Sequence, residues 1–348
     1  MGIKVNAREK TVLPDQPFIV DAFRPGDAKG MVNLFLTVYG KDYPIKTFYY
    51  RDKIIRENSL GNIYSVVART PSNDIVGHGA LFRSSPWSQN LFEIGQMLIL
   101  PSYRTTFAAF KIHQYLSEEL ILKILPDGIF GEAVCNHITT QKVSSLIDMK
   151  DVAMELDLMP ASAYVKEKSA PGRVTCLIQF KGIKEDVQEI FIPRMYREQA
   201  AFILQDLNLK RRISESSASM PLNSKSIIHR KFFSHAGVGR FNVVSTGRDF
   251  GRKLAGLERL GISKRMQVMQ FFINLAEPWS GEAIEILTNK GYFLGGLVPQ
   301  WFVTDGLLLQ KINTTPDVRF IKLHTPKARS LLEMILTDKE RADQNIYR

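Results

Sequence analysis

The chain has 348 residues, of which 45% are hydrophobic, 23% charged and 10% aromatic. This composition excludes a disordered chain, a collagen-like chain and a disulfide scaffold, and the length predicts two domains. Cys135 and Cys176 are the only cysteines, so neither an oxidising compartment nor a zinc cluster is indicated. The N-terminus lacks the apolar stretch of a secretory signal, and no apolar run approaches the roughly 18–20 residues of a membrane span. We therefore expect a cytoplasmic protein without a membrane partner.

The basic residues are concentrated in one segment. The chain carries 46 Lys and Arg against 35 Asp and Glu, a net charge of +11. Residues 207–265, here called the basic band, contain thirteen Lys and Arg against only Glu215, Asp249 and Glu258. Such a band attracts phosphates or another anionic partner, or it is simply a solvated basic face. We do not expect nucleic acid, because neither aromatic RNA-binding strands nor a helix-turn-helix spacing accompanies the charge.

The first half of the chain alternates between strand and helix patterns in a fixed order. Apolar alternation predicts strands, and apolar residues three or four apart predict helices. Asp27 is a candidate N-cap for the first helix. The predicted elements in chain order are strand 18–23, helix 28–39, helix 48–58, strand 62–69, strand 75–82, strand 92–100, helix 106–125, strand 128–136, helix 140–149 and strand 174–180.

The second half repeats this ending after a polar hinge at residues 181–186. Its predicted elements are strand 187–192, helix 197–211, loop 213–225, strands 226–233 and 239–245, helix 249–260, strand 267–275, helix 281–289, strands 307–312 and 318–323, and helix 326–343. The recurring order of strand, helix, strand, helix and strand predicts an α+β fold. We expect two domains, residues 18–182 and 187–348, each a twisted mixed sheet flanked by helices.

Several common catalytic motifs are absent from the sequence. It contains no GxxxxGK[ST] or GxGxxG loop, no HExxH and no GxSxG elbow, which argues against the enzyme classes that those motifs mark. His229 and His235 could meet across a strand, but no acidic residue or cysteine joins them, so no metal site is expected.

One segment, residues 92–109, combines features that suit a phosphate ligand. An apolar strand ends at Pro101, Arg104 follows, and Ala108 and Ala109 open a long helix. Small residues at such a turn let main-chain amides approach a ligand, and the helix N-terminus favours negative charge. The segment therefore predicts a pyrophosphate-binding turn.

At these residues the chain resembles the GNAT (N-acetyltransferase) superfamily, whose pattern is Q/R-x-x-G-x-G/A after a strand. Arg104 fits the first position and Ala109 the last, while Phe107 stands where the family has Gly. The resemblance covers about residues 18–182. It implies that acetyl-CoA or another acyl-CoA is the cosubstrate. The residues that would bind it are Leu98 and Ile99, beside the thioester carbonyl, and Arg104, Thr105, Thr106, Phe107, Ala108 and Ala109, around the pyrophosphate.

The resemblance also implies catalytic roles. Glu93 lies eleven residues before Arg104, an offset at which some branches of the family carry a general base, and burial on the strand would raise its pKa towards a working range. The alternative is a carboxylate that only ends a strand. The acid that many members carry, a tyrosine after the next strand, is replaced here by Val143, Ser144 and Ser145.

The second half resembles the same family more faintly. Gly291 in the sequence Gly-Tyr-Phe resembles the family turn, and the counterpart of the phosphate-binding turn is residues 248–253, where Lys253 replaces a small residue. The whole chain thus resembles tandem two-domain bacterial GNAT-like proteins with a degenerate second domain. Two functions follow: an N-acyltransferase acting on a small-molecule or peptide amine, or a non-catalytic module that senses CoA, a nucleotide or a protein partner.

Overall fold

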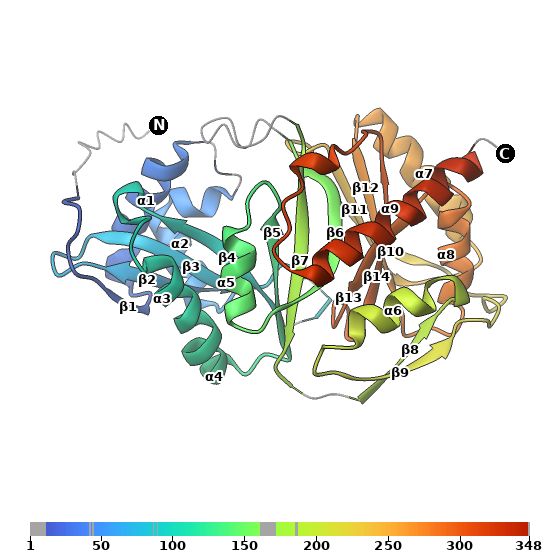
Figure 1. Ribbon diagram of the computed structural model, residues 1–348, viewed down its shortest axis with the longest axis horizontal. Coiled ribbons are helices and arrows are strands. Elements are labelled where there is room, and N and C mark those ends of the chain that lie inside the picture. The colour runs from blue at the N-terminus through green and yellow to red at the C-terminus, as the bar shows by residue number, and fades with distance from the viewer. Residues whose placement is uncertain are drawn as a thin grey trace. The chain divides into compact units, whose positions relative to one another are not determined.

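The structure is a computed structural model that describes residues 12–41, 43, 45–85, 87–88, 90–160, 172–184 and 187–346 (Figure 1). The chain divides by its contacts into two compact units. Unit 1 comprises Met1–Ser84 and Phe92–Leu125, and unit 2 comprises Ser85–Leu91 and Pro126–Arg348. Each unit is described below by itself.

Unit 1 is a four-stranded antiparallel sheet with helices on both faces. The strands lie in the order β1-β2-β3-β4. Its elements are β1 (Ile19–Ala22), α1 (Ala28–Tyr39), α2 (Arg51–Ser59), β2 (Ile63–Arg69), β3 (Ile75–Phe82), β4 (Leu91–Ile99), α3 (Ala108–Gln114), a π-helical turn (Tyr115–Leu120) and α4 (Ile121–Ile124).

The two faces of the β3 strand contact different helices. On one face, the fully buried Phe35 of α1 and Phe48 stack at 4.3 Å between ring centroids. On the other face, a Cβ at Gly79 would lie 2.7 Å from the Ile112 side chain of α3. The close approach of α3 to β3 therefore requires a residue without a side chain, which explains the glycine.

A buried ion pair connects the start of α1 to β2. The Arg69 guanidinium donates to both carboxylate oxygens of Asp27, at 2.8 and 2.6 Å, and both side chains are nearly inaccessible. Asp27 precedes α1 as the sequence predicts, but its carboxylate accepts from Arg69 and from the Arg24 amide and makes no cap to the helix. The bidentate geometry stabilises the pair against the cost of burying two charges.

Unit 2 contains a mixed sheet of eight strands and a separate parallel pair, β8 and β9. The eight strands lie in the order β5-β7-β6-β13-β14-β12-β11-β10. Its elements are β5 (Gly128–Val134), α5 (Thr139–Leu146), β6 (Lys150–Met159), β7 (Val174–Gly182), β8 (Val187–Ile192), α6 (Arg197–Leu204), β9 (Lys210–Glu215), β10 (Ile227–Phe233), β11 (Val238–Ser245), α7 (Phe250–Ser263), β12 (Val268–Asn274), α8 (Ser280–Thr288), β13 (Phe293–Val298), β14 (Gly306–Ile312) and α9 (Pro326–Ile346).

The order of the inner strands is symmetric about the junction of β6 and β13. On one side the order is β6, β7, β5, and on the other it is β13, β14, β12, with antiparallel pairing throughout. At the junction, Ala153 faces Gly296, whose φ is +132°. A Cβ at Gly296 would lie 2.5 Å from the Ala153 Cα, so only glycine fits there.

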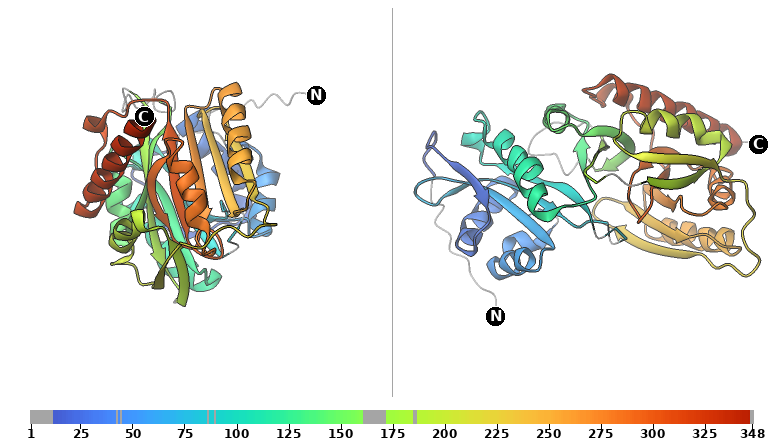
Figure 2. Two further views of the ribbon diagram at one scale, coloured as in Figure 1. Left: turned by 90° about the vertical axis from the view of Figure 1, so that its right-hand side faces the viewer. Right: turned by 90° about the horizontal axis from the view of Figure 1, so that it is seen from below.

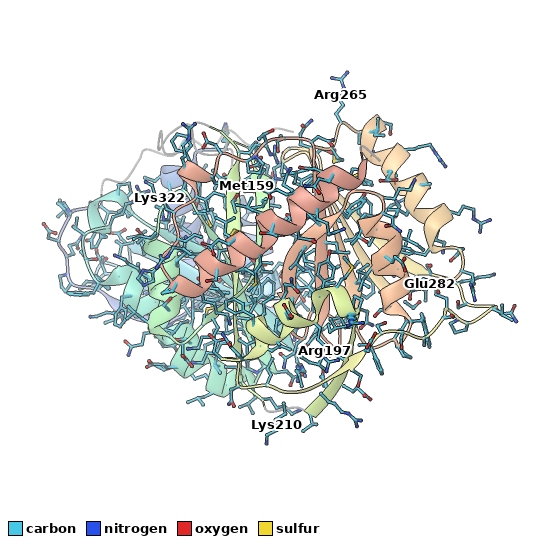
Figure 3. All side chains as sticks on the ribbon, turned by 45° about the vertical axis from the view of Figure 1, so that its right-hand side comes forward. Met159, Arg197, Lys210, Arg265, Glu282 and Lys322 are labelled. Atoms are coloured by element: carbon cyan, nitrogen blue, oxygen red, sulfur yellow. The ribbon has the colours of Figure 1, made fainter. Side chains whose placement is uncertain are left out.

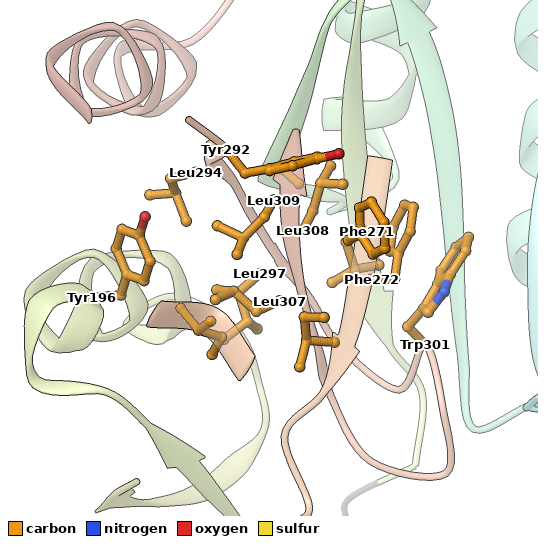
Figure 4. Close-up of a cluster of buried hydrophobic side chains, with 14 of the residues drawn as sticks. Tyr196, Phe271, Phe272, Tyr292, Leu294, Leu297, Trp301, Leu307, Leu308 and Leu309 are labelled. Carbon is orange, nitrogen blue, oxygen red and sulfur yellow. The ribbon is translucent and has the colours of Figure 1, made fainter. Parts of the chain in front are cut away.

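The hydrophobic core of unit 2 spans both halves of this sheet. Figure 4 shows part of it, where Trp301 lies against Phe272 at 4.4 Å between ring centroids and Tyr292 meets Phe271. Helices α6 and α9 contact β6 and β13. In both views of Figure 2, α9 and α7 lie on opposite sides of the strands of this unit.

The mixed α+β fold class is confirmed, whereas several predicted elements are wrong. Strands β6 and β13 were not expected, and the predicted helix 197–211 ends at Leu204. The predicted strand 318–323 is a single 3-10 turn, Val318–Phe320. The Asp317 side chain accepts from the Arg319 amide and pairs with the Arg319 guanidinium, which favours a turn over a strand.

The boundary expected at residues 181–186 stays a prediction. Gly182 ends β7, and residues 185–186 lie outside the described part of the chain. The compact units divide elsewhere, because β5, β7 and β6 share one sheet with the strands that follow residue 187.

A buried charge network lies inside unit 2. Arg240 of β11 donates to the Glu155 carboxylate of β6 at 2.6 Å and to Glu132 of β5 at 3.3 Å. Gln270 of β12 donates to the same Glu155 oxygen at 2.8 Å. The guanidinium also lies 5.4 Å from the centre of the Phe272 ring. The network therefore connects strands that are distant in the sequence.

The network contains two carboxylates, those of Glu132 and Glu155, and a single arginine, Arg240. Glu155 is completely buried, and its second oxygen, Oε2, has no hydrogen-bond partner among the described residues. Burial first, and the nearby charge of Glu132 second, raise the pKa of Glu155 to about 7. Folding therefore favours the protonated form of Glu155 between its ordinary pKa of 4.5 and about 7.

We predict that unit 2 loses stability as pH rises from about 5 to 8, and that Glu155→Gln removes this loss. A raised carboxyl pKa contributes stability at low pH that disappears as pH rises through the folded-state value. Relative to the wild type, the variant should gain on the order of 2–3 kcal/mol in the free energy of unfolding between pH 5 and 8. Denaturant unfolding across this range measures it.

Glu132→Gln is the matched variant. It removes the like charge but keeps Glu155 ionisable, so the pH-dependent loss should remain and move to lower pH. If wild type and Glu155→Gln show parallel stability profiles from pH 5 to 8, the assignment of the titrating group to Glu155 is wrong.

Candidate functional site

The candidate site in unit 1 is centred on an irregularity in β4. His78 of β3 faces Leu98 and Ala80 faces Gly95, so Gln96 and Met97 together oppose the single residue Gly79. Gln96 has a left-handed φ of +54°, which costs a residue with a side chain roughly 1 kcal/mol or more. This is a β-bulge, a feature that re-aims main-chain groups and is often found near active sites.

The His78 side chain makes a hydrogen bond to the main chain of the bulge. Its ring is fully buried, and Nδ1 lies 2.9 Å from the Gln96 carbonyl oxygen. Burial lowers the pKa of His78 to about 4, so the ring is neutral near pH 7. Because a carbonyl oxygen only accepts, Nδ1 carries the proton, and Nε2 accepts from the Ser65 hydroxyl at 3.1 Å.

Glu93 lies on the same strand, three residues before the bulge. Its side chain is half-buried, and it is opposite Phe82 of β3. Tyr43, in the segment between α1 and α2, lies within electrostatic reach, since burial chiefly, and the charges of Tyr39 and Glu93 in addition, raise its pKa. The Tyr39 and Tyr43 rings are 4.8 Å apart, and the Tyr43 amide donates to the Tyr49 hydroxyl.

These tyrosines were missed by the sequence analysis. The only sequence signal is the density of aromatic residues between positions 39 and 50, which by itself indicates core packing as readily as a site. The tertiary fold places that aromatic segment beside Glu93.

The predicted cofactor residues form an exposed turn followed by a helix. Arg104 and Thr105 are exposed, and the Thr106 hydroxyl accepts from the Ala108 amide at 3.2 Å. The following amides of α3 begin a helix whose first turn lacks intrahelical acceptors. No acidic residue occurs between Leu100 and Lys111, so the turn is electrostatically open to an anion.

Phe107 does not fill this turn. Its side chain is 75% exposed, so the ring points away from the helix start. The side chains of Leu98 and Ile99 lie in the core and are 4% and 8% exposed. Both residues can therefore offer only main-chain groups to a ligand.

The tyrosines near the turn are engaged elsewhere. The Tyr103 hydroxyl donates to the Leu13 carbonyl at 2.8 Å, and the Tyr115 hydroxyl accepts from Lys123 at 3.3 Å. In unit 2, α5 carries Ser144 and Ser145 as the sequence shows, and Ser145 donates to the Gln141 carbonyl.

The corresponding turn of unit 2, between β11 and α7, is held by internal contacts. Asp249 accepts from the Ser226 amide at 2.7 Å and pairs with Lys253 at 3.1 Å. Burial would raise the pKa of Asp249, but these hydrogen bonds and the Lys253 charge lower it to about 2. Arg248 and Gly251 are exposed, and a side chain at Gly251 would meet nothing within 4 Å.

The basic band does not form one surface. Arg211 is buried against Asp305 at 2.8 Å, and Arg240 belongs to the internal network. Figure 3 shows Lys210 and Arg265 at opposite ends of this unit. The charge that the sequence concentrates in residues 207–265 is therefore dispersed by the fold, and part of it is neutralised inside the protein.

In the part of the chain that the structure describes, no group of three or more His, Cys, Asp or Glu residues is arranged to hold a metal ion. No described helix has both the length and the apolar character needed to cross a membrane.

Comparisons with known proteins give a partial result. No family model matches the chain, and no curated protein matches it. Solved structures that are similar to about half of this chain include acetyltransferases, one of them described as a putative acetyltransferase of the GNAT family. The ribosomal-protein-S5-alanine acetyltransferase from Vibrio fischeri shares 8% identity at a TM-score of 0.40, over 48% of this chain and 93% of that one.

Two other structures show the same level of similarity. An N-acetyltransferase from Staphylococcus aureus Mu50 shares 11% identity at a TM-score of 0.40, over 49% of this chain and 100% of that one. Mutant forms of the spermidine/spermine N-acetyltransferase from Vibrio cholerae share 10% identity at a TM-score of 0.38, over 47% of this chain and 93% of that one. Similarity this low does not establish an activity, so the functional argument depends on the site itself.

We predict that His78→Gln reduces the loss of stability at acid pH, part of which the buried His113 also causes because burial lowers its pKa to about 4. The unfolded state protonates His78 near 6.5, whereas the folded state does so only near 4. The wild type should therefore lose about 3 kcal/mol through this group as pH falls from 6.5 to 4, and the variant should not. Unfolding measured across this range tests the difference in slope. An unaltered slope in His78→Gln would contradict the burial argument.

Proposed function

We propose that the chain is an acyl-CoA-dependent N-acyltransferase that transfers an acetyl or related acyl group to a small-molecule or peptide amine. The observation that carries this proposal is the bulged strand β4, which runs into an exposed turn and an open helix start and also bears Glu93. A bulge, an anion-compatible helix start and a carboxylate on one strand suit acyl transfer from a phosphorylated carrier.

The residues present fit an anionic cosubstrate. Arg104 and Thr105 are exposed at the turn, and the first amides of α3 would bind the pyrophosphate. The main chain around Gln96 to Ile99 would orient the thioester carbonyl. Gln96 Oε1, buried with no partner among the described residues, is one further acceptor at the bulge.

Bound acyl-CoA supplies a thioester carbonyl carbon, to which the amine nitrogen bonds as the carbon–sulfur bond breaks and the thiolate leaves with the electron pair and takes up a proton. Glu93 would accept the proton that the amine loses, directly or through water. Its half-buried position between core and surface permits both contact with an amine and partial exclusion of water.

We also propose that the chain is a tandem of two related α+β domains, residues 18–182 and 187–348, of which the second is degenerate. The symmetric strand order about β6 and β13 supports duplication, as does the parallel β11–β12 pair connected through α7. Degeneracy is supported by the parallel β8–β9 pair outside the main sheet and by Lys253, which is committed to Asp249.

A non-catalytic module that binds CoA, a nucleotide or a protein partner is the second candidate. The observation in its favour is the absence of a tyrosine on α5 together with the Phe107 ring at the exposed turn. Cytoplasmic location and an anionic partner for the exposed part of the basic band remain parts of the proposal for either function.

We predict that Ala109→Asp abolishes CoA binding. The new carboxylate would lie in the first turn of α3, where it repels pyrophosphate and occupies the same amides. Wild-type affinity should be in the micromolar range, about −8 kcal/mol. Titration calorimetry with CoA measures both. Ala201→Asp, at an exposed position of α6 in unit 2, is the charge-matched control and should bind as the wild type does; equal binding by Ala109→Asp would place the site elsewhere.

We predict that Glu93→Gln lowers acyl transfer by about 10²–10⁴-fold, the usual contribution of a general base, while CoA affinity is retained. The assay is a screen of amines with acetyl-CoA, read as thiol release. Glu118→Gln, an exposed residue of the same unit, should keep full activity. Turnover in the wild type that survives Glu93→Gln would remove Glu93 from the mechanism, and CoA binding without turnover for any amine would favour the non-catalytic module.

A further inference from the structure

A small cavity of about 170 Å³ lies at one end of the sheet of unit 2. Its walls come from the end of β5 (Asn136), the end of β6 (Asp157), the start of β7 (Arg173, Thr175) and the segment after β14 (Thr315, Phe320). Its described lining residues all belong to unit 2, whereas the bulge, Glu93 and the α3 turn belong to unit 1.

Arg173 presents two unused donors at this cavity. A guanidinium has five N–H groups. Nε donates to the Asp157 main-chain carbonyl at 2.6 Å, and Nη2 donates to the Leu158 and Ala236 carbonyls, both at 2.8 Å. Among the described residues, Nη1 has no hydrogen-bond acceptor. Three carbonyls thus fix the orientation of the guanidinium, while one of its edges stays available.

Asp157 presents one unused acceptor. Its residue is 5% exposed and has a left-handed φ of +51°. The Thr314 hydroxyl donates to Oδ2, and the Asp157 amide donates to Thr175 Oγ1 at 3.2 Å. In the described part of the chain, no group donates a hydrogen bond to Asp157 Oδ1. The carboxylate is therefore held in place by one oxygen, and the other is available.

The two charges do not pair with each other. The contact between these residues runs from the guanidinium to the Asp157 main-chain carbonyl, and no ion pair between the two side chains occurs among the described residues. Burial raises the pKa of Asp157 and lowers the pKa of Arg173, and the attraction between the two charges opposes both shifts without reversing them. Opposite charges that line one small cavity and form no direct ion pair match a ligand that carries both.

We propose that this cavity binds a small free α-amino acid as its zwitterion, with the ammonium group at Asp157 Oδ1 and the carboxylate at Arg173 Nη1. Both contacts are charge-assisted and partly buried, the setting in which such hydrogen bonds contribute most. Asn136 and Thr315 add polar groups to the wall, and Phe320 adds an apolar one.

The size of the cavity limits the ligand. A water molecule occupies about 30 Å³ of liquid, so the cavity holds about six water-sized groups. Glycine, alanine and serine have about this number of non-hydrogen atoms, so they are the probes. The proposal concerns binding and is independent of the acyltransferase proposal.

The test measures binding of glycine, alanine and serine to the full chain by calorimetry and ligand-observed NMR. The tightest binder is then compared with its amide, which lacks the carboxylate, and its N-acetyl derivative, which lacks the ammonium. We expect each loss of charge to weaken binding at least tenfold. Failure of all three amino acids to bind, or equal binding of the parent compound and either derivative, overturns the proposal.

Two variants assign the charges to residues. Asp157→Asn should weaken the amino acid at least tenfold and leave the N-acetyl derivative unchanged, whereas Arg173→Lys should weaken the amino acid and leave the amide unchanged. Asp148→Asn, an exposed residue outside the cavity whose side chain pairs with Lys150, is the control and should bind as the wild type does. Thermal unfolding confirms that each variant is folded; a folded Asp157→Asn with wild-type affinity contradicts the assignment.

Discussion

The sheet of unit 2 depends on the single place where β6 meets β13. Gly296 brings the two main chains together opposite Ala153, because it lacks the side chain that would collide there. Gln310 of β14 reinforces the join by accepting from the Leu156 amide and donating to the Met154 carbonyl, each at 2.9 Å. Without this contact, β6 and β13 would each be an edge strand with unpaired main-chain groups. Met154 and Leu156 of β6 and Leu294 and Leu297 of β13 belong to one buried cluster, part of which Figure 4 shows.

The sequence could predict those elements in which local pattern and tertiary environment agree. The sequence predicted β2, β3, β4, α1, α7 and α8 close to where the structure has them. β6 was missed because it carries Asp151, Glu155 and Asp157, which a local pattern assigns to the surface. Each of these carboxylates accepts a hydrogen bond from a residue that is distant in the sequence, namely Thr325, Arg240 and Thr314. Only the tertiary fold supplies those partners.

The same limit applies to the candidate site. The strand, the turn and the helix that contain Glu93, Arg104 and Ala109 were predicted from pattern and family resemblance, and the structure has these elements in that order. The bulge at Gln96 has no sequence signature, because a glutamine does not indicate a left-handed φ. The side chain that hydrogen-bonds the bulge is His78, a residue eighteen positions earlier that the sequence presents as one more strand residue. The roles of the site residues stay predictions.

The Arg240 network also limits the order in which this chain can change during evolution. Losing the arginine first would leave two carboxylates together in the interior, an expensive intermediate. Losing the Glu155 charge first leaves one arginine with one carboxylate, a balanced pair. We therefore expect substitutions that remove an acidic residue of the network to precede the loss of Arg240. Residues at positions 132, 155, 240 and 270 should vary together among descendants. Glu132 and Glu155 precede the polar hinge, and Arg240 and Gln270 follow it. Substitutions in one half of the chain therefore depend on which residues the other half carries.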